Sequence, residues 1–170
     1  MNFKERNLLI VGAGEYGRLV KEVACDVELF NRIEFLDDKV NGVLGKISDM
    51  QKYQDEFHYA IIAMGDATLR KTIMEQLRSC GYEIVSLIHP KSNVSKSASI
   101  GDGCVVEPCA VVQPGSIVGE GCLICSGAVV GHDSIVGGYC HLNLGAIVPP
   151  KSNVKENVKI NVGKVYEGEF

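Results

Sequence analysis

The chain has 170 residues, of which 46% are hydrophobic, enough to build a core in one ordinary domain or two small ones. The net charge is only −4 and no long basic or acidic run is present, which argues against binding to nucleic acid. No apolar stretch reaches the roughly 18 residues of a membrane helix, and the N-terminal segment lacks a cleavage site, so we expect a cytoplasmic protein without membrane insertion.

The N-terminal part begins with a short apolar run that is followed by glycines. The run NLLIV predicts a strand, and Gly12, Gly14 and Gly17 follow it in the spacing G-x-G-x-x-G. We expect a helix next, with an apolar side made of Leu19, Val20, Val23 and Ala24. The segment IEFLDD then predicts a second strand that ends at Asp37 and Asp38, about twenty residues beyond the glycines.

Strands and helices continue to alternate up to about residue 90. We expect a strand at about 58–64, then Gly65, a helix over about 68–79, and another strand at about 83–88. The apolar side of that helix is expected to contain Leu69, Ile73 and Leu77. Alternating strands and helices form parallel sheets, so residues 1–90 are predicted to be a small Rossmann-like α/β domain.

The glycine turn is a candidate site for a phosphate group. N–H groups and the helix dipole favour an anion at a helix N-terminus, and an acid after the second strand can bind ribose hydroxyls. A complete dinucleotide domain does not fit before the next domain begins, so one nucleotide is preferred over NAD. In the other interpretation, the glycines only permit a tight turn.

A six-residue repeat dominates residues 91–170. Every sixth residue from Val94 onward is aliphatic, in the order Val94, Ile100, Val106, Val112, Val118, Ile124, Val130, Val136, Leu142, Val148, Val154 and Ile160. Four residues after each of these, up to Val148, stands a small residue, in the order Ala98, Cys104, Ala110, Ser116, Cys122, Ala128, Ser134, Cys140, Ala146 and Ser152. Side chains alternate between the faces of a strand, so both sets point inward, which predicts a β-helix with three short faces and eighteen residues per coil.

The cysteines fit this repeat better than a metal or disulfide site. Seven is an odd number, and their spacing is not that of a zinc ribbon, so we expect reduced thiols and no metal. Cys104, Cys122 and Cys140 should stack inside the prism, about 4.8 Å apart.

The residue before each aliphatic position is often apolar too. Alternation turns these side chains outward, at Val105, Val111, Ile117, Leu123, Val129, Ile135 and Ile147. Such an apolar wall usually marks a protein interface, and with equivalent flat faces a closed cyclic trimer is the expected assembly.

His132 is the first candidate for catalysis. It follows the inward Val130 by two residues, where the chain turns between faces and the repeat does not require a ring. Imidazole can take up a proton near neutral pH, so His132 is a candidate general base. Asp133 can orient the ring only if the chain turns there, because adjacent side chains of an extended segment point apart. In the other interpretation, His132 is a solvated surface residue.

Several of these motifs occur together in one known family. The segments GAGEYG, FLDD, IIAMGD, LIHP and GHDSIVGGYCH, together with the hexapeptide repeat, resemble the bacterial sugar O/N-acyltransferases, which include UDP-N-acetylbacillosamine N-acetyltransferases and sialic-acid O-acetyltransferases. This resemblance covers nearly the whole chain. It implies a left-handed parallel β-helix, a homotrimer with active sites between subunits, acetyl-CoA as donor, and a nucleotide-sugar as acceptor.

The resemblance also implies roles for individual residues. The family's general base corresponds to His132 and its acidic neighbour to Asp133, while His141 and Val162 correspond to acetyl-CoA-binding positions. The positions that bind the nucleotide-sugar correspond to Gly12, Ala13, Gly14, Asp37, Asp38 and Gly65. Tyr16 stands where the bacillosamine enzymes have a histidine, and the sequence stops at Phe170, before the family's usual end.

These observations favour an acetyl-CoA-dependent N-acetyltransferase that modifies a nucleotide-activated amino sugar in glycan or surface polysaccharide biosynthesis. A sialic-acid-type sugar O-acetyltransferase is the near alternative. Because the sequence ends before the family's usual end, a third alternative is a catalytically silent trimer that binds a nucleotide-sugar. A nucleotide-binding oxidoreductase is disfavoured, because the Rossmann-like unit is incomplete.

Overall fold

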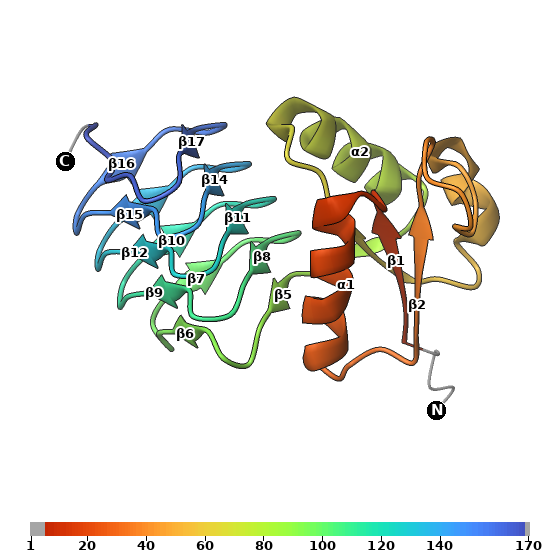
Figure 1. Cartoon of the computed structure of the whole chain (residues 1–170), viewed down its shortest axis with the longest axis horizontal. Helices are drawn as coiled ribbons and strands as arrows, with labels where there is room; N and C mark the ends of the chain where they lie inside the picture. The colour runs from red at the N-terminus through yellow and green to blue at the C-terminus, as the bar shows by residue number, and fades with distance from the viewer. Residues whose placement is uncertain (1–5, 169–170) are drawn as a thin grey trace. The chain divides into compact units, whose positions relative to one another are not determined.

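A computed structural model describes residues 6–168 of the chain. The chain divides into two compact units, Met1–Val85 and Ser86–Phe170 (Figure 1). The first unit contains the α/β elements and the second contains the repeat, and the division falls before residue 90, where we placed it from the sequence. Within the described range, no helix combines the length and the apolar character needed to cross a membrane.

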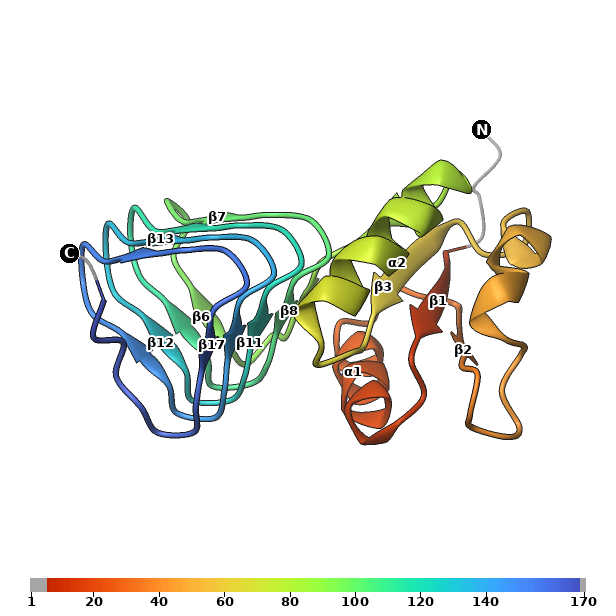
Figure 2. The same ribbon diagram turned by 90° about the horizontal axis from the view of Figure 1, so that it is seen from above.

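The N-terminal unit is built on a parallel sheet with the strand order β2-β1-β3-β4. Its elements are β1 (Asn7–Val11), α1 (Glu15–Asp26), β2 (Arg32–Leu36), the 3₁₀ helix η1 (Ile47–Tyr53), β3 (Tyr59–Ile62), α2 (Ala67–Ser79) and β4 (Glu83–Ile84). The apolar strand β1 is buried along its length, and Figure 2 shows α1 and α2 on opposite sides of the sheet. The strand order reverses between β1 and β3, so the carboxyl ends of these strands form a topological switch point.

The buried sides of the two helices differ from our expectation. Leu19 in α1 and Leu69 in α2 were expected to be buried, but they are 36% and 46% exposed. The buried side of α1 consists of Gly17, Val20, Val23 and Ala24, and that of α2 consists of Arg70, Ile73, Met74 and Leu77. Arg70 is fully buried because its guanidinium has a local partner: Nη1 donates a hydrogen bond to the Met64 carbonyl oxygen at 2.8 Å.

The second unit is a parallel β-helix. Within the described residues its strands form three sheets, ordered β17-β14-β11-β8-β5, β15-β12-β9-β6 and β16-β13-β10-β7. The strands are β5 (Leu87–Ile88), β6 (Asn93–Val94), β7 (Ser99–Ile100), β8 (Val105–Val106), β9 (Val111–Val112), β10 (Ile117–Val118), β11 (Leu123–Ile124), β12 (Val129–Val130), β13 (Ile135–Val136), β14 (His141–Leu142), β15 (Ile147–Val148), β16 (Asn153–Val154) and β17 (Lys159–Ile160). Val105 pairs with Leu123, eighteen positions later, and Figure 2 shows the coils stacked with a triangular outline.

The predicted inward positions form the core of this β-helix. From Cys104 to Ile160, the aliphatic and small residues of the repeat are buried, and all of them except the serines make one continuous hydrophobic cluster, which confirms the register. The thiols of Cys104, Cys122 and Cys140 donate hydrogen bonds of 3.1 to 3.2 Å to carbonyl oxygens fifteen residues later. Hydrogen bonding with Cys104, together with burial, raises the pKa of Cys122 to about 12, so this thiol stays protonated at neutral pH.

The outward positions do not form one continuous apolar wall. Val105 and Leu123 are fully buried, so they do not belong to an exposed apolar wall. Ile117 and Ile135 pair across β10 and β13 and are 50% and 48% exposed, and Ile147 is 39% exposed. Of the outward apolar positions expected from the sequence, the exposed ones therefore lie on the two sheets that contain β10 and β15.

The single strand expected at about 83–88 is in fact two strands. β4 ends the sheet of the first unit, whereas β5 begins the β-helix, with Leu87 paired to Val105. Ile88 lies six residues before Val94, so the repeat starts one position earlier than we counted. This break could not be predicted, because both strands are short and the two residues between them, Val85 and Ser86, are neither glycine nor proline.

Candidate active site

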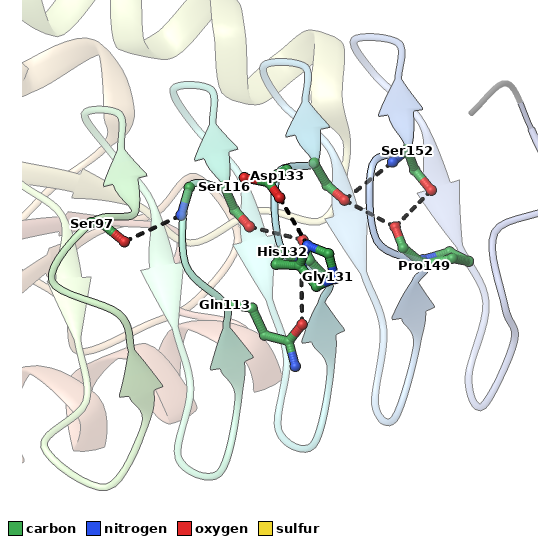
Figure 3. A network of polar contacts seen from close by, with 10 residues as sticks. Ser97, Gln113, Ser116, Gly131, His132, Asp133, Pro149 and Ser152 are labelled. Atoms are coloured by element: carbon green, nitrogen blue, oxygen red, sulfur yellow. Dashed lines mark hydrogen bonds and ion pairs between the residues drawn. The ribbon is translucent and has the colours of Figure 1, made fainter.

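His132 and Asp133 lie in the turn after β12, at a corner of the β-helix (Figure 3). Asp133 has a φ of 58°, a left-handed conformation that bends the chain and brings its side chain toward the preceding one. As a result, His132 Nδ1 lies 2.9 Å from Asp133 Oδ2. The turn that this contact requires is therefore present, although the sequence alone could not establish it.

The contact with Asp133 determines which nitrogen of His132 is available for chemistry. A carboxylate only accepts hydrogen bonds, so Nδ1 carries the proton and Nε2 keeps its lone pair. Both side chains are well exposed, His132 by 46% and Asp133 by 61%. An accessible imidazole with a fixed tautomer can take a proton from a bound nucleophile.

The coil below supports the backbone of this turn. Gln113 Oε1 accepts a hydrogen bond from the His132 backbone N–H at 2.9 Å, and the Pro114 carbonyl oxygen accepts one from the Asp133 N–H at 3.0 Å. Gln113 was not among the site residues expected from the sequence. One coil back from residues 131–133 lie residues 113–115, so the eighteen-residue period contained the signal that could have identified it.

His141 begins β14, in a sheet that does not contain β12. Its Nε2 lies 3.5 Å from the sulfur of the buried Cys125. Nearby, Oε2 of the buried Glu107 accepts hydrogen bonds from the backbone N–H and the hydroxyl of Ser126, at 2.9 and 3.0 Å. Burial and the charge of Glu107 raise the pKa of the Cys125 thiol well above its usual range, so His141 has a neutral thiol beside it.

The other site residue expected on the β-helix is Val162. It follows β17 and is 63% exposed. Because His132 follows β12 and His141 lies in β14, one chain presents these two histidines from different sheets. Among the described residues, no group of three or more His, Cys, Asp or Glu side chains is arranged to hold a metal ion.

The glycine turn lies between β1 and α1. Gly12 donates its N–H to the Leu36 carbonyl oxygen at 2.9 Å, and Gly14 is the N-cap residue of α1. Gly17 packs so closely on this turn that a Cβ there would overlap with the Gly12 carbonyl oxygen. The start of α1 is therefore held against the end of β1, the arrangement in which helix N–H groups bind phosphate.

Asp37 connects the glycine turn to the end of β2. Its Oδ2 accepts a hydrogen bond from the Ala13 N–H at 2.7 Å, and its Oδ1 accepts from the N–H groups of Lys39 and Val40 at 2.8 and 3.0 Å. Burial by itself would raise the pKa of this carboxyl, but the three hydrogen bonds outweigh burial and hold the pKa below its usual value. Asp37 thus stabilises the turn, a role that the sequence did not reveal.

Asp38 and Gly65 are exposed where β2 and β3 end. Asp38 Oδ1 accepts a hydrogen bond from the Ile47 N–H at 3.0 Å. Gly65 follows β3, and apart from Gly65 itself and its chain neighbours no atom of the described residues lies within 4 Å of the position that a Cβ would take. Parallel strands end at the same edge of a sheet, so the structure brings Gly12, Asp38 and Gly65 to the edge that contains the switch point.

We expect Asp37→Asn to lower the free energy of unfolding by about 1–2 kcal/mol at neutral pH, because an amide oxygen accepts hydrogen bonds more weakly than a carboxylate. A carboxyl whose pKa is lowered in the folded state stabilises the fold above its unfolded-state pKa, and this contribution is lost as the pH falls through the folded-state pKa. Thermal unfolding between about pH 7 and pH 3 should therefore depend less on pH in the variant. The matched control is Asp38→Asn, and an equal loss in both variants would contradict the role of Asp37.

The N-terminal unit matches a known domain family. Residues 7–77 match the model of the PglD N-terminal domain. A curated relative, UDP-N-acetylbacillosamine N-acetyltransferase of Bacillus subtilis, is 29% identical over 111 residues, which make up 59% of this chain and 51% of the relative. The chain thus spans about half the length of the curated relative that it matches.

Solved structures share the fold over nearly the whole chain. The acetyltransferase domain of PglB from Neisseria gonorrhoeae aligns with a TM-score of 0.83 and 29% identity, over 97% of this chain and 93% of that chain. The same domain in complex with acetyl coenzyme A aligns with a TM-score of 0.81 and 28% identity, over 96% and 94%. These matches confirm a small Rossmann-like sheet followed by a left-handed parallel β-helix. In its N-terminal sequence and in its fold, the chain therefore resembles the bacterial sugar acyltransferases with hexapeptide repeats, as its motifs predict.

Proposed function

We propose that the chain is an acetyl-CoA-dependent N-acetyltransferase that acts on a nucleotide-linked amino sugar, in glycan or surface polysaccharide biosynthesis. The observation that carries this proposal is the preformed, exposed pair of His132 and Asp133 at a corner of the β-helix. Two similarities support it. The curated relative is a UDP-N-acetylbacillosamine N-acetyltransferase, and the fold is that of an acetyltransferase domain solved with acetyl coenzyme A.

In the proposed reaction His132 is the general base. The sugar amine attacks the thioester carbonyl carbon, a C–N bond forms, and His132 Nε2 takes up the proton that the nitrogen loses. The C–S bond then breaks, and the imidazolium returns the proton to the departing sulfur, so the products are an amide and a free thiol. Asp133 keeps the ring in the correct tautomer and stabilises the imidazolium while it exists.

The acceptor is proposed to bind through its nucleotide to the N-terminal unit. The turn from Gly12 to Gly14 lies at the N-terminus of α1, where N–H groups and the helix dipole favour a phosphate. The exposed carboxylate of Asp38 can accept hydrogen bonds from ribose hydroxyls, and Gly65 leaves the adjacent strand end open. Ala13 and Asp37 shape this site through the hydrogen bond that joins them.

Acetyl-CoA is proposed to bind at the surface of the β-helix with contacts to His141 and Val162. We further propose a homotrimer, because Ile117 and Ile135 leave an apolar ladder exposed on one sheet. One chain presents His132 and His141 from different sheets, and a closed trimer allows different sheets of neighbouring chains to face a shared site.

The experiment that tests the proposed function follows the release of free thiol from acetyl-CoA. Amino sugars linked to UDP, GDP or CMP are offered one at a time, beside matched sugars that carry a hydroxyl in place of the amine. We expect thiol release with at least one amino sugar and none with its hydroxyl counterpart. Release with hydroxyl sugars alone would identify an O-acetyltransferase. No release at all, together with a thermal shift caused by a nucleotide-sugar, would identify a catalytically silent binding protein.

A further inference from the structure

Residues with left-handed backbone conformation stack at one corner of the β-helix. Gly115, Asp133 and Lys151 follow β9, β12 and β15, and their φ values are 70°, 58° and 61°. They are eighteen residues apart, so each lies one coil from the next. A glycine thus lies directly below the acidic member of the His132–Asp133 pair.

The Asp133 carboxylate lies across this glycine. A Cβ on Gly115 would overlap with Asp133 Oδ1, while Oδ2 of the same carboxylate is in contact with His132 Nδ1. The Gly115 N–H donates a hydrogen bond to Ser97 Oγ at 3.3 Å, which holds the glycine from the coil below. One oxygen of the carboxylate therefore rests against Gly115 and the other against the imidazole.

We propose that Gly115 is a positioning residue for the His132–Asp133 pair. Because Gly115 has no side chain, the Asp133 carboxylate can lie close to the backbone of the coil below. In that position its Oδ2 reaches the ring of His132. Any larger residue at 115 displaces the carboxylate and removes the partner that keeps the proton on Nδ1. This inference rests on the proposed function in one respect, that His132 acts as the base.

A glycine is also favoured at position 115 by its backbone conformation alone, and the chain offers a control for that effect. Gly127 has a φ of 73°, and the nearest atoms to a Cβ there belong to the Gly145 backbone, 3.8 Å away. Alanine at 127 therefore has the same left-handed conformation to adopt but meets no carboxylate. A comparison of Gly115→Ala with Gly127→Ala separates displacement of Asp133 from backbone strain.

The test reads the tautomer of His132 directly. Nitrogen NMR of the histidine rings shows which ring nitrogen carries the proton, and the His132 signals are those that disappear in His132→Ala. We expect the Nδ1–H form in the wild type and in Gly127→Ala, and the Nε2–H form in Gly115→Ala and Asp133→Ala. Turnover of Gly115→Ala should fall about tenfold at unchanged KM, as expected when only the tautomer is disturbed.

The proposal is overturned if His132 keeps the Nδ1–H form in Gly115→Ala, or if Gly127→Ala changes the tautomer to the same extent. If Gly115→Ala does not fold, the double variant Gly115→Ala/Asp133→Ala tests whether the displaced carboxylate is the cause. It should regain a cooperative thermal transition, because the displaced carboxylate is gone. A double variant that stays unfolded contradicts the proposal. If the wild type transfers no acetyl group, the proposed function fails while the NMR comparison still decides the role of Gly115.

Discussion

His132→Ala is expected to lower the turnover rate by about 10² to 10⁴, while the affinity for the nucleotide-sugar stays nearly unchanged. The reason is that the imidazole takes up a proton only as the C–N bond forms, so its removal destabilises the transition state and leaves ground-state binding intact. The side chain is 46% exposed and does not belong to the hydrophobic core cluster, so the fold should not change. The measurement is thiol release under saturating substrates, with the thermal midpoint recorded for each preparation.

A companion variant shows whether the ring or its orientation matters. Asp133→Asn places an amide beside Nδ1, and an amide that donates to Nδ1 moves the ring proton to Nε2, where it blocks the base. Turnover should then fall, as it does in His132→Ala.

His141→Ala changes a residue on another sheet, and it should instead raise KM for acetyl-CoA more than it lowers turnover. Full activity of His132→Ala would show that another group is the base.

Val118→Asp is expected to prevent folding of the β-helix. Val118 is 1% exposed and points into the prism, where an ionised carboxylate would have neither water nor a hydrogen-bond donor. The cost of several kcal/mol is a large part of the total stability of an ordinary domain. Circular dichroism and thermal unfolding should show the loss of a cooperative transition.

The matched control for this prediction is the preceding residue of the same strand. Ile117 also belongs to β10, but it is 50% exposed on the outer surface. Ile117→Asp should therefore keep the fold of the chain, although it should weaken any association through the exposed ladder with Ile135. If both variants unfolded to the same extent, the assignment of inward and outward positions would be wrong.

The β-helix could be predicted almost completely from the sequence, because its period fixes the direction of every side chain. The inward register from Val94 to Ile160 is confirmed, and the stacking of Cys104, Cys122 and Cys140 follows from it. Burial of the outward Val105 and Leu123 could not be predicted. The repeat determines the direction in which a side chain points, but it contains no information about what packs against an outward side chain.

The helices of the first unit show why an apolar pattern is a weaker guide there. Leu69 fits the helical period, yet it is exposed, while the charged Arg70 is fully buried. Hydrophobicity alone assigns an arginine to the surface. The hydrogen bond from Arg70 to the Met64 carbonyl oxygen reverses that assignment, and Met64 lies outside the helix, so the helical pattern could not reveal it.

The candidate catalytic residues could be named from the sequence, but their geometry could not. His132 stood out because the repeat does not require a ring at its position, whereas its contact with Asp133 depends on a φ of 58° at a residue other than glycine. Residues other than glycine adopt this conformation rarely, and the repeat does not show which of them will do so. Gln113 and Gly115 escaped notice because they act one coil away, where the repeat suggested only an ordinary turn.

The stacked coils also restrict how the length of this protein can change during evolution. An insertion of one residue would turn every later aliphatic side chain outward, because neighbouring residues of a strand face opposite sides. An insertion of one hexapeptide between residues 115 and 131 would keep those side chains inside the prism. The same insertion would move residues 131–133 to the next corner, away from Gln113 and Gly115. The β-helix can therefore lengthen by six residues and remain folded, while the site between these two turns survives only if their spacing stays fixed.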